Sequence, residues 1–158
     1  MKWLVGLCLI CLPLKHFKIN SYYGYRMHPI SGKYAMHYGI DLKAHDDTVY
    51  AIMDGRVSAE SYDKVLGINL HISHGQLESI YGHLSQLLVG EQDSVLAGQP
   101  IAITGATGRV TGEHLHFSLR YQQRFINPIK FFYELLNNQQ HERKFQTTAG
   151  TAIRKAGR

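Results

Sequence analysis

Cysteine is nearly absent from this sequence: only Cys8 and Cys11 occur among the 158 residues, and both stand near the start. A disulfide framework and a cysteine-ligated zinc site are therefore excluded for the rest of the chain. Proline is also scarce, at four residues, and charged residues make up 18%, against about 25% in typical globular proteins. Because 44% of the residues are hydrophobic, the chain has enough apolar side chains for a folded core.

Net positive charge is concentrated at the C-terminal end. The formal charge is +5, but five of the 17 basic residues and one of the 12 acidic residues lie at positions 137–158. The rest of the chain is nearly neutral and has no stripe of basic and aromatic residues, which argues against specific nucleic-acid binding. Residues 137–158 also lack a hydrophobic period, so we expect a basic, disordered tail there.

The longest hydrophobic run is at the N-terminus, where Lys2 precedes the apolar segment Trp3–Leu14. This order is typical of a secretory signal. The run is shorter than the roughly 20 residues that a membrane-spanning helix needs. We therefore expect residues 1–18 to be a leader that directs export to the periplasm, the cell envelope or the exterior, with membrane association through this segment as a further expectation. The alternative is a buried first strand.

Fifteen glycines and ten tyrosines indicate a turn-rich β protein. Short segments of alternating apolar residues predict strands at 17–25, 48–58 (with a hairpin at Asp54-Gly55), 65–72 and 77–81 (joined at His74-Gly75), 95–104 (interrupted by Gly98) and 113–121. A glycine-rich loop is predicted at 105–112. One helix is predicted, at Pro128–Asn137, because proline suits a first turn and Ile129, Phe132, Tyr133 and Leu136 share a face. The regular spacing of these short strands predicts an antiparallel sheet or a barrel-like fold.

Two pairs of polar residues can provide metal ligands. On a strand, His114 and His116 project from the same face, with Leu115 pointing into the core. In an extended segment His37 and Asp41 also share a face, with Gly39 leaving the space between them open. Two histidines and a carboxylate are the composition of a catalytic zinc site, whose fourth position stays open for water.

The remaining histidine of the strand pair, together with His83, is then free to carry protons. His28 is expected to have a structural role and His74 to belong to a turn. Arg26 is expected either to hold the loop near the site or to contact an anionic substrate. The glutamate base of an H-E-x-x-H motif does not occur in the sequence.

These residues resemble a known family in their order as well as their type. The matching motifs are Gly24-Tyr25-Arg26-Met27-His28-Pro29, His37-Tyr38-Gly39-Ile40-Asp41, Val49-Tyr50-Ala51, Asp54-Gly55, His74-Gly75, Tyr81-Gly82-His83-Leu84-Ser85, Gly98-Gln99, Gly105-Ala106-Thr107-Gly108, Thr111-Gly112, His114-Leu115-His116-Phe117 and Asn127-Pro128. Over residues 19–136 the chain resembles the M23 zinc metallopeptidases of the lysostaphin/LytM type, which are peptidoglycan endopeptidases. The resemblance implies a mostly β catalytic domain, built on an antiparallel sheet (duplicated hybrid motif-like) with one short C-terminal helix.

Carried over position by position, the resemblance implies one Zn²⁺ bound by His37, Asp41 and His116, with His83 and His114 as the catalytic histidines. It implies a secreted endopeptidase that cuts peptide cross-links or stem peptides of peptidoglycan through a metal-activated water. The alternatives are a catalytically silent wall-binding or amidase-activator module and a component that opens the wall locally for a surface or conjugation apparatus. The bond cleaved and the oligomeric state stay open.

Three departures from the family pattern bear on substrate preference rather than on the metal. The segment Asp46-Asp47-Thr48 replaces a glycine-containing turn, and Glu113 precedes the paired histidines. Ser118 stands where an acid is common.

Overall fold

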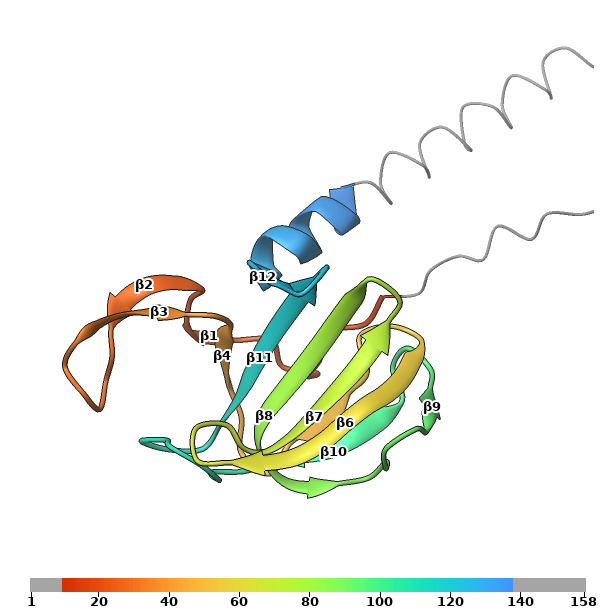
Figure 1. The fold of residues 1–158 in the computed structure, drawn as a ribbon, viewed down its shortest axis with the longest axis horizontal. Coiled ribbons are helices and arrows are strands. Elements are labelled where there is room, and N and C mark those ends of the chain that lie inside the picture. The colour runs from red at the N-terminus through yellow and green to blue at the C-terminus, as the bar shows by residue number, and fades with distance from the viewer. Residues whose placement is uncertain (1–9, 138–158) are drawn as a thin grey trace, which may run out of the picture. The chain divides into compact units, whose positions relative to one another are not determined.

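The computed structural model describes residues 10–137, which fall into two units that separate after Asn127. The first unit is built of β-strands (Figure 1). Their bounds are β1 Ile19–Ser21, β2 Gly24–Met27, β3 Tyr34–His37, β4 Ile40–Lys43, β5 Thr48–Tyr50, β6 Gly55–Asp63, β7 Gly67–His74, β8 Leu77–Leu87, β9 Ser94–Val95, β10 Pro100–Thr104, β11 His114–Tyr121 and β12 Arg124–Ile126.

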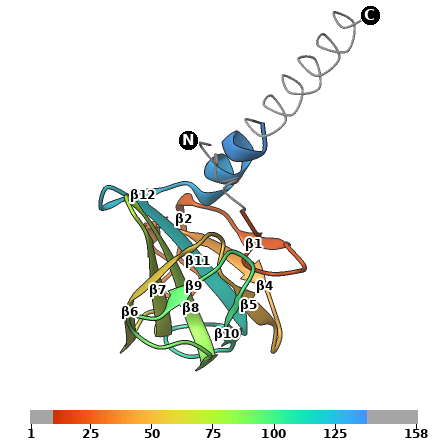
Figure 2. The same ribbon diagram turned by 90° about the vertical axis from the view of Figure 1, so that its right-hand side faces the viewer.

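Ten of these strands form one antiparallel sheet with the order β1-β4-β11-β8-β7-β6-β9, and β10 joins β8 to β5 while β12 pairs with β11. Figure 2 shows the strong curvature of this sheet. The predicted fold class, a mostly β antiparallel domain of the lysostaphin type with one C-terminal helix, is confirmed.

The core lies on one face of the curved sheet, as the period-two alternation of β4 and β11 predicts. Ile40 and Leu42 of β4 and Leu115 and Phe117 of β11 are fully buried, whereas the residues between them face the other side. Burying such side chains stabilises a domain by roughly 1.5–3 kcal/mol each. This packing fixes the strands that carry the site residues.

The strands β2 and β3 form a separate two-stranded sheet, a hairpin that extends to the side of the large sheet in Figure 1. The prediction of a single strand over 17–25 is therefore wrong, because β1 ends at Ser21 and β2 begins at Gly24. Gly24 has a φ of 128°, which lies in the region that favours glycine, and the chain leaves the large sheet just before it.

Of two predictions made at glycines, one fails and one is confirmed. The predicted hairpin at Asp54-Gly55 does not exist, because β5 pairs with β10 whereas β6 pairs with β7 and β9. Between β5 and β6 the amide of Ala51 donates to the carbonyl of Gln99, and the chain crosses here to another part of the sheet. The interruption predicted at Gly98 within 95–104 is present: this glycine, whose φ is 78°, lies between β9 and β10.

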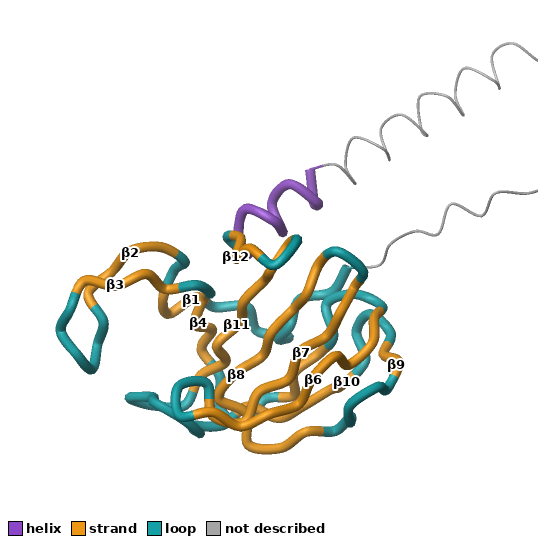
Figure 3. The backbone as a smooth tube through the Cα atoms, viewed as in Figure 1, coloured by secondary structure: helices purple, strands orange, loops and turns teal. Residues whose placement is uncertain are grey.

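The hairpin through His74-Gly75 is present, although β8 runs beyond the predicted end to Leu87. The glycine-rich segment between β10 and β11 is a loop, as predicted (Figure 3). The strand β12 was missed, because the turn before it uses Gln122 and Gln123, with φ of 47° and 65°, in place of the glycine or asparagine that marks such turns.

Part of the predicted leader belongs to the described residues. Leu14 is buried, the amide of Cys11 donates to the carbonyl of Ile52, and the amide of Tyr50 donates to the carbonyl of Pro13. Residues 11–14 thus lie against the segment around β5. Residues 1–9 and the predicted tail from 138 onward lie outside the described part, and a role in export or membrane association stays a prediction. Between residues 10 and 137 no helix is long and apolar enough to cross a membrane.

The second unit contains the predicted helix, which begins at residue 128 and continues through residue 137. Its predicted apolar face is only partly buried: Phe132 is 6% exposed, whereas Tyr133 is 66% exposed. On the exposed side, Lys130 and Glu134 are one helical turn apart with 3.8 Å between their charged atoms.

Candidate active site

Strands β3, β4 and β11 carry the three predicted ligands. β11 lies between β4 and β8, so that His116 is directly opposite Asp41 on one side and Gly82 on the other. Directly opposed residues of antiparallel strands present their side chains on the same face, about 4.5–5.5 Å apart at Cβ. His37 reaches this point from the end of β3. The strand register therefore brings the carboxylate to the second histidine of the predicted pair.

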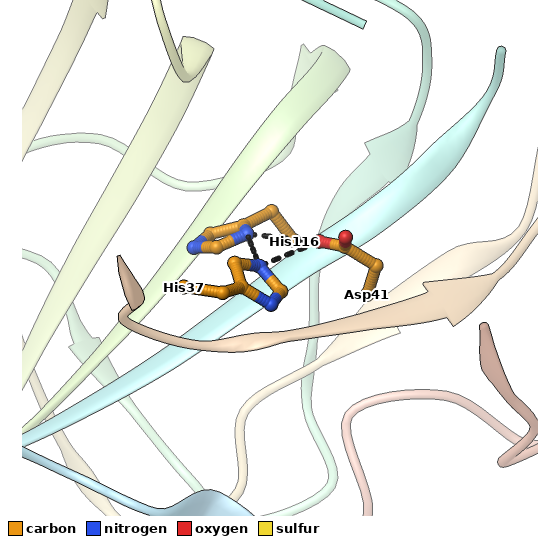
Figure 4. A group of neighbouring side chains, drawn as sticks. All are labelled: His37, Asp41 and His116. Atoms are coloured by element: carbon orange, nitrogen blue, oxygen red, sulfur yellow. Dashed lines mark hydrogen bonds and ion pairs between the residues drawn. The ribbon is translucent and has the colours of Figure 1, made fainter. Parts of the chain in front are cut away.

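The ligand atoms of His37, Asp41 and His116 converge on one point (Figure 4). Nε2 of His37 lies 3.2 Å from Nδ1 of His116 and 3.2 Å from Oδ1 of Asp41, and the latter two atoms are 3.0 Å apart. Donor atoms placed about 2.0–2.1 Å from a tetrahedral zinc ion lie about 3.3 Å from one another. The three atoms thus form a triangle of the size expected for one face of a zinc site.

Hydrogen bonds behind the ligands determine which ring nitrogens face the centre. Nδ1 of His37 lies 2.9 Å from the carbonyl oxygen of Tyr22, which can only accept, so neutral His37 presents the lone pair of Nε2. Nδ1 of His116 faces two acceptors, on His37 and on Asp41, and one hydrogen cannot serve both. Since a cation satisfies all three atoms, the donor set fits a divalent metal.

Asp41 is held as an ionised carboxylate. Burial opposes its ionisation, but the close contacts of its carboxylate with His116 and His37 outweigh burial and hold the pKa of Asp41 well below its usual range. Its second oxygen accepts a hydrogen bond from Arg26 at 3.2 Å. Nε2 of His116 lies 2.8 Å from the hydroxyl of Ser118, so this departure from the family pattern supplies a partner for a candidate ligand.

Gly39 allows β4 to approach the strand that carries His116. A Cβ atom at this position would lie 2.6 Å from the carbonyl oxygen of Phe117 and 2.6 Å from Oγ of Ser118, closer than real contacts. The sequence predicted that this glycine leaves room near the site. The structure shows that the room is taken by β11 itself, because the two strands touch at this position.

His83 reaches the site through a backbone conformation that is rare outside glycine. Its φ is 62°, and it stands where β8 changes partners, since Gly82 pairs with β11 and Leu84 pairs with β10. The ring centroid of His83 lies 5.9 Å from that of His116. A residue of this kind at a site is a common form of local strain that the surrounding fold maintains.

His83 and His114 are both oriented through Nδ1. Nδ1 of His83 donates to the carbonyl oxygen of Thr107 at 2.9 Å, and Nδ1 of His114 donates to that of Gly112 at 2.8 Å. In each neutral ring Nε2 then holds the lone pair. Nε2 of His114 lies 3.6 Å from Oδ1 of Asp41. Burial, with lesser effects of the neighbouring histidines, lowers the pKa of His83 to about 4.

A single groove of about 680 Å³ is lined by all five predicted site residues. One wall is formed by the β2–β3 hairpin, which contributes Arg26 and His28. The opposite wall is formed by the 105–113 loop, which contributes Arg109 and Glu113. The groove is large enough to hold several residues of an extended peptide.

Glu113 has a role that the sequence analysis did not assign. Its carboxylate accepts hydrogen bonds from the amide of Asp46, from the hydroxyl of Thr104 and from Nδ1 of His45. These bonds outweigh burial and lower the pKa of Glu113. Two departures noted in the sequence, the altered turn at 46–48 and Glu113, therefore contact each other and attach the loop before His114 to the turn after β4.

Two other histidines, His71 and His74, contact residues outside the groove. Nδ1 of His74 donates to the carbonyl of Asp54 at 2.8 Å, and Nδ1 of His71 lies 3.4 Å from Oε1 of Glu78. Neither histidine is among the residues that line the groove. His28, in contrast, lines the groove.

Three candidate metal ligands beside two further histidines in an open groove have the composition expected of a metal-dependent hydrolase site. The chain belongs to peptidase family M23, whose model matches residues 35–128. This confirms the family resemblance seen in the sequence.

Curated proteins and solved structures resemble this chain. A relative from Neisseria meningitidis named DD-carboxypeptidase/endopeptidase Mpg is 38% identical over 119 residues, which cover 74% of this chain and 27% of the relative. A crystal structure of a zinc-containing peptidase from Vibrio cholerae has a TM-score of 0.71 at 33% identity and covers 76% of this chain and 39% of that one.

The catalytic domain of lysostaphin from Staphylococcus simulans has a TM-score of 0.66 at 30% identity and covers 73% of this chain and 91% of that one. The chain thus spans about the length of an isolated catalytic domain of the family but about a quarter of the curated relative from Neisseria.

Proposed function

We propose that this protein is a zinc-dependent endopeptidase that hydrolyses peptide cross-links or stem peptides of bacterial peptidoglycan. The observation that carries the proposal is the triangle of His37 Nε2, Asp41 Oδ1 and His116 Nδ1, with sides of 3.0–3.2 Å. Names of the relatives support the substrate: they include peptidoglycan DD-endopeptidases and lysostaphin. Since peptidoglycan lies outside the cytoplasmic membrane, the proposal includes export of the protein.

His37, Asp41 and His116 would hold the zinc ion, which when bound supplies polarisation of a peptide carbonyl and activation of a water. His83 and His114 would move protons at Nε2, because Nδ1 of each ring is occupied by a backbone carbonyl. With its pKa lowered to about 4, His83 is neutral near pH 7 and keeps a free lone pair on Nε2, but the same shift makes it a weaker base than an ordinary histidine. One of the two histidines would act as the general base, and the other would stabilise negative charge or protonate the leaving amine.

Incubation of the purified chain with sacculi, with and without a chelator, tests the proposal. Mass spectrometry of released muropeptides should show chelator-sensitive cleavage and identify the bond cut. His116→Ala should lose both zinc and activity, whereas His114→Ala should keep zinc and lose activity. The exposed His16, changed to alanine, is the matched control and should keep both.

Two outcomes would contradict the proposal. Zinc-loaded protein that binds sacculi and releases nothing would favour a silent wall-binding or activator module. Equal zinc loss in His114→Ala and His116→Ala would refute the assignment of ligand and proton carrier.

A further inference from the structure

Two donor side chains meet across the groove. NH2 of Arg109, on the 105–113 loop, lies 3.4 Å from Nε2 of His28, at the tip of the β2–β3 hairpin. Both residues line the groove that contains the candidate metal ligands. The two walls therefore approach each other at this pair.

The hydrogen bonds of His28 show that its Nε2 carries a hydrogen. Nδ1 of His28 accepts from the amides of Ile30 and Ser31, both at 3.3 Å. A neutral imidazole with a lone pair on Nδ1 has its hydrogen on Nε2. Arg109 has only donors, so the 3.4 Å contact joins two donors that do not bond to each other and that can both donate to an acceptor placed beside them.

The backbones that carry both donors are held before any ligand binds. The amide of His28 donates to the carbonyl of Lys33, and the amide of Gly32 donates to the carbonyl of His28, which closes the tip of the hairpin. The amide of Arg109 donates to the carbonyl of Val65 at 3.0 Å and holds the loop in place. Binding therefore costs little ordering of these backbones.

Charge at this point is positive and unpaired. Between residues 10 and 137, no carboxylate lies within ion-pair distance of Arg109. The other charged groups of the groove are engaged: Arg26 bonds to Asp41, and Glu113 accepts from a turn amide and a hydroxyl. A carboxylate, with one oxygen for each donor, is the group that this pair fits.

We infer that Arg109 and His28 form a carboxylate clamp that binds a free carboxylate of the stem peptide next to the bond to be cut. The inference rests on the proposed function and narrows its substrate class, because a clamp of this kind selects anionic stem peptides over uncharged glycine cross-bridges. The carboxylate belongs either to a side branch of the peptide or to its C-terminus.

Peptide binding tests the clamp apart from cleavage. The zinc-loaded His114→Ala protein is titrated calorimetrically with a synthetic stem peptide, with the same peptide amidated at the C-terminus, and with the same peptide amidated on its side-branch carboxylate. Amidation at one position should weaken binding by about 10- to 100-fold, the effect of losing hydrogen bonds to a charged group, and that position identifies the carboxylate.

Variants of the clamp should remove this discrimination. Arg109→Gln should weaken the free-carboxylate peptide by a similar factor and leave the sensitive amidated peptide unchanged, and Arg109→Lys should be intermediate because it keeps the charge without the fork. His28→Asn keeps an acceptor for the turn amides and removes the Nε2 hydrogen, so it should act in the same direction as Arg109→Gln. Lys18→Gln, an exposed lysine outside the groove, is the control.

Equal binding of all three peptides would overturn the clamp, as would equal weakening of every peptide in Arg109→Gln. Absence of any peptide binding would also overturn it. Failure of the proposed function is distinct: sacculi then release no muropeptides, while carboxylate-dependent binding persists.

Discussion

Acidification of the metal-free protein should reduce its stability through His83. Its pKa falls from 6.5 in an ordinary environment to about 4 in the fold, first because of burial. Between these values the unfolded chain binds a proton that the folded chain does not, so the free energy of unfolding falls as the pH is lowered through this range. A difference of about 2.5 units corresponds to about 3 kcal/mol.

Urea unfolding of chelator-treated protein, followed by circular dichroism between about pH 7 and about pH 4.5, measures this slope. Burial also lowers the pKa of His116 and of His74, so the wild type should have a steeper slope than His83 alone would give. His83→Gln should remove the part due to His83, whereas His16→Gln, at an exposed position, should leave the slope unchanged. Equal slopes in wild type and His83→Gln would refute the reasoning.

Two further substitutions test the packing around the site. Gly39→Ala should destabilise the protein by about 1–3 kcal/mol and weaken zinc binding, because the added methyl carbon would lie 2.6 Å from the carbonyl oxygen of Phe117. The control is Gly112→Ala, where a Cβ meets nothing within 4 Å. Equal urea midpoints for the two variants would contradict the close approach at Gly39. Glu113→Gln should lower stability at neutral pH by about 1–3 kcal/mol, because a charged acceptor of three hydrogen bonds is lost. The control Glu60→Gln, at an exposed position, should have no effect on the urea midpoint. An equal loss of stability in both variants would assign the effect to net charge.

Each of the two pairs of candidate site residues could be predicted from the sequence because it depends on short-range periodicity. His114 and His116 share a face on any strand, and Asp41 follows His37 at a spacing that suits an extended segment. What joins the two segments is the register of β4 on β11, which no local pattern encodes. Only the order of several motifs, shared with a known family, connected them in advance.

The parts that could not be predicted depend on backbone conformations that the residue type conceals. His83 has a left-handed φ, and so do Gln122 and Gln123 before the missed strand β12, although none of them is glycine or asparagine. The Asp54-Gly55 pair shows the reverse, since it has the residues of a hairpin turn but lies between strands with different partners. In each case the tertiary pairing overrides the local preference.

The division of the ligands between two sheets has a mechanical consequence. His37 ends the small β2–β3 sheet, whereas Asp41 and His116 belong to the large one. An ion held by all three is a cross-link between these sheets, and it would anchor the base of the hairpin whose tip carries His28. Metal loading and the width of the groove would then be coupled. A chelator would remove the ion and also loosen the wall of the groove that the hairpin forms.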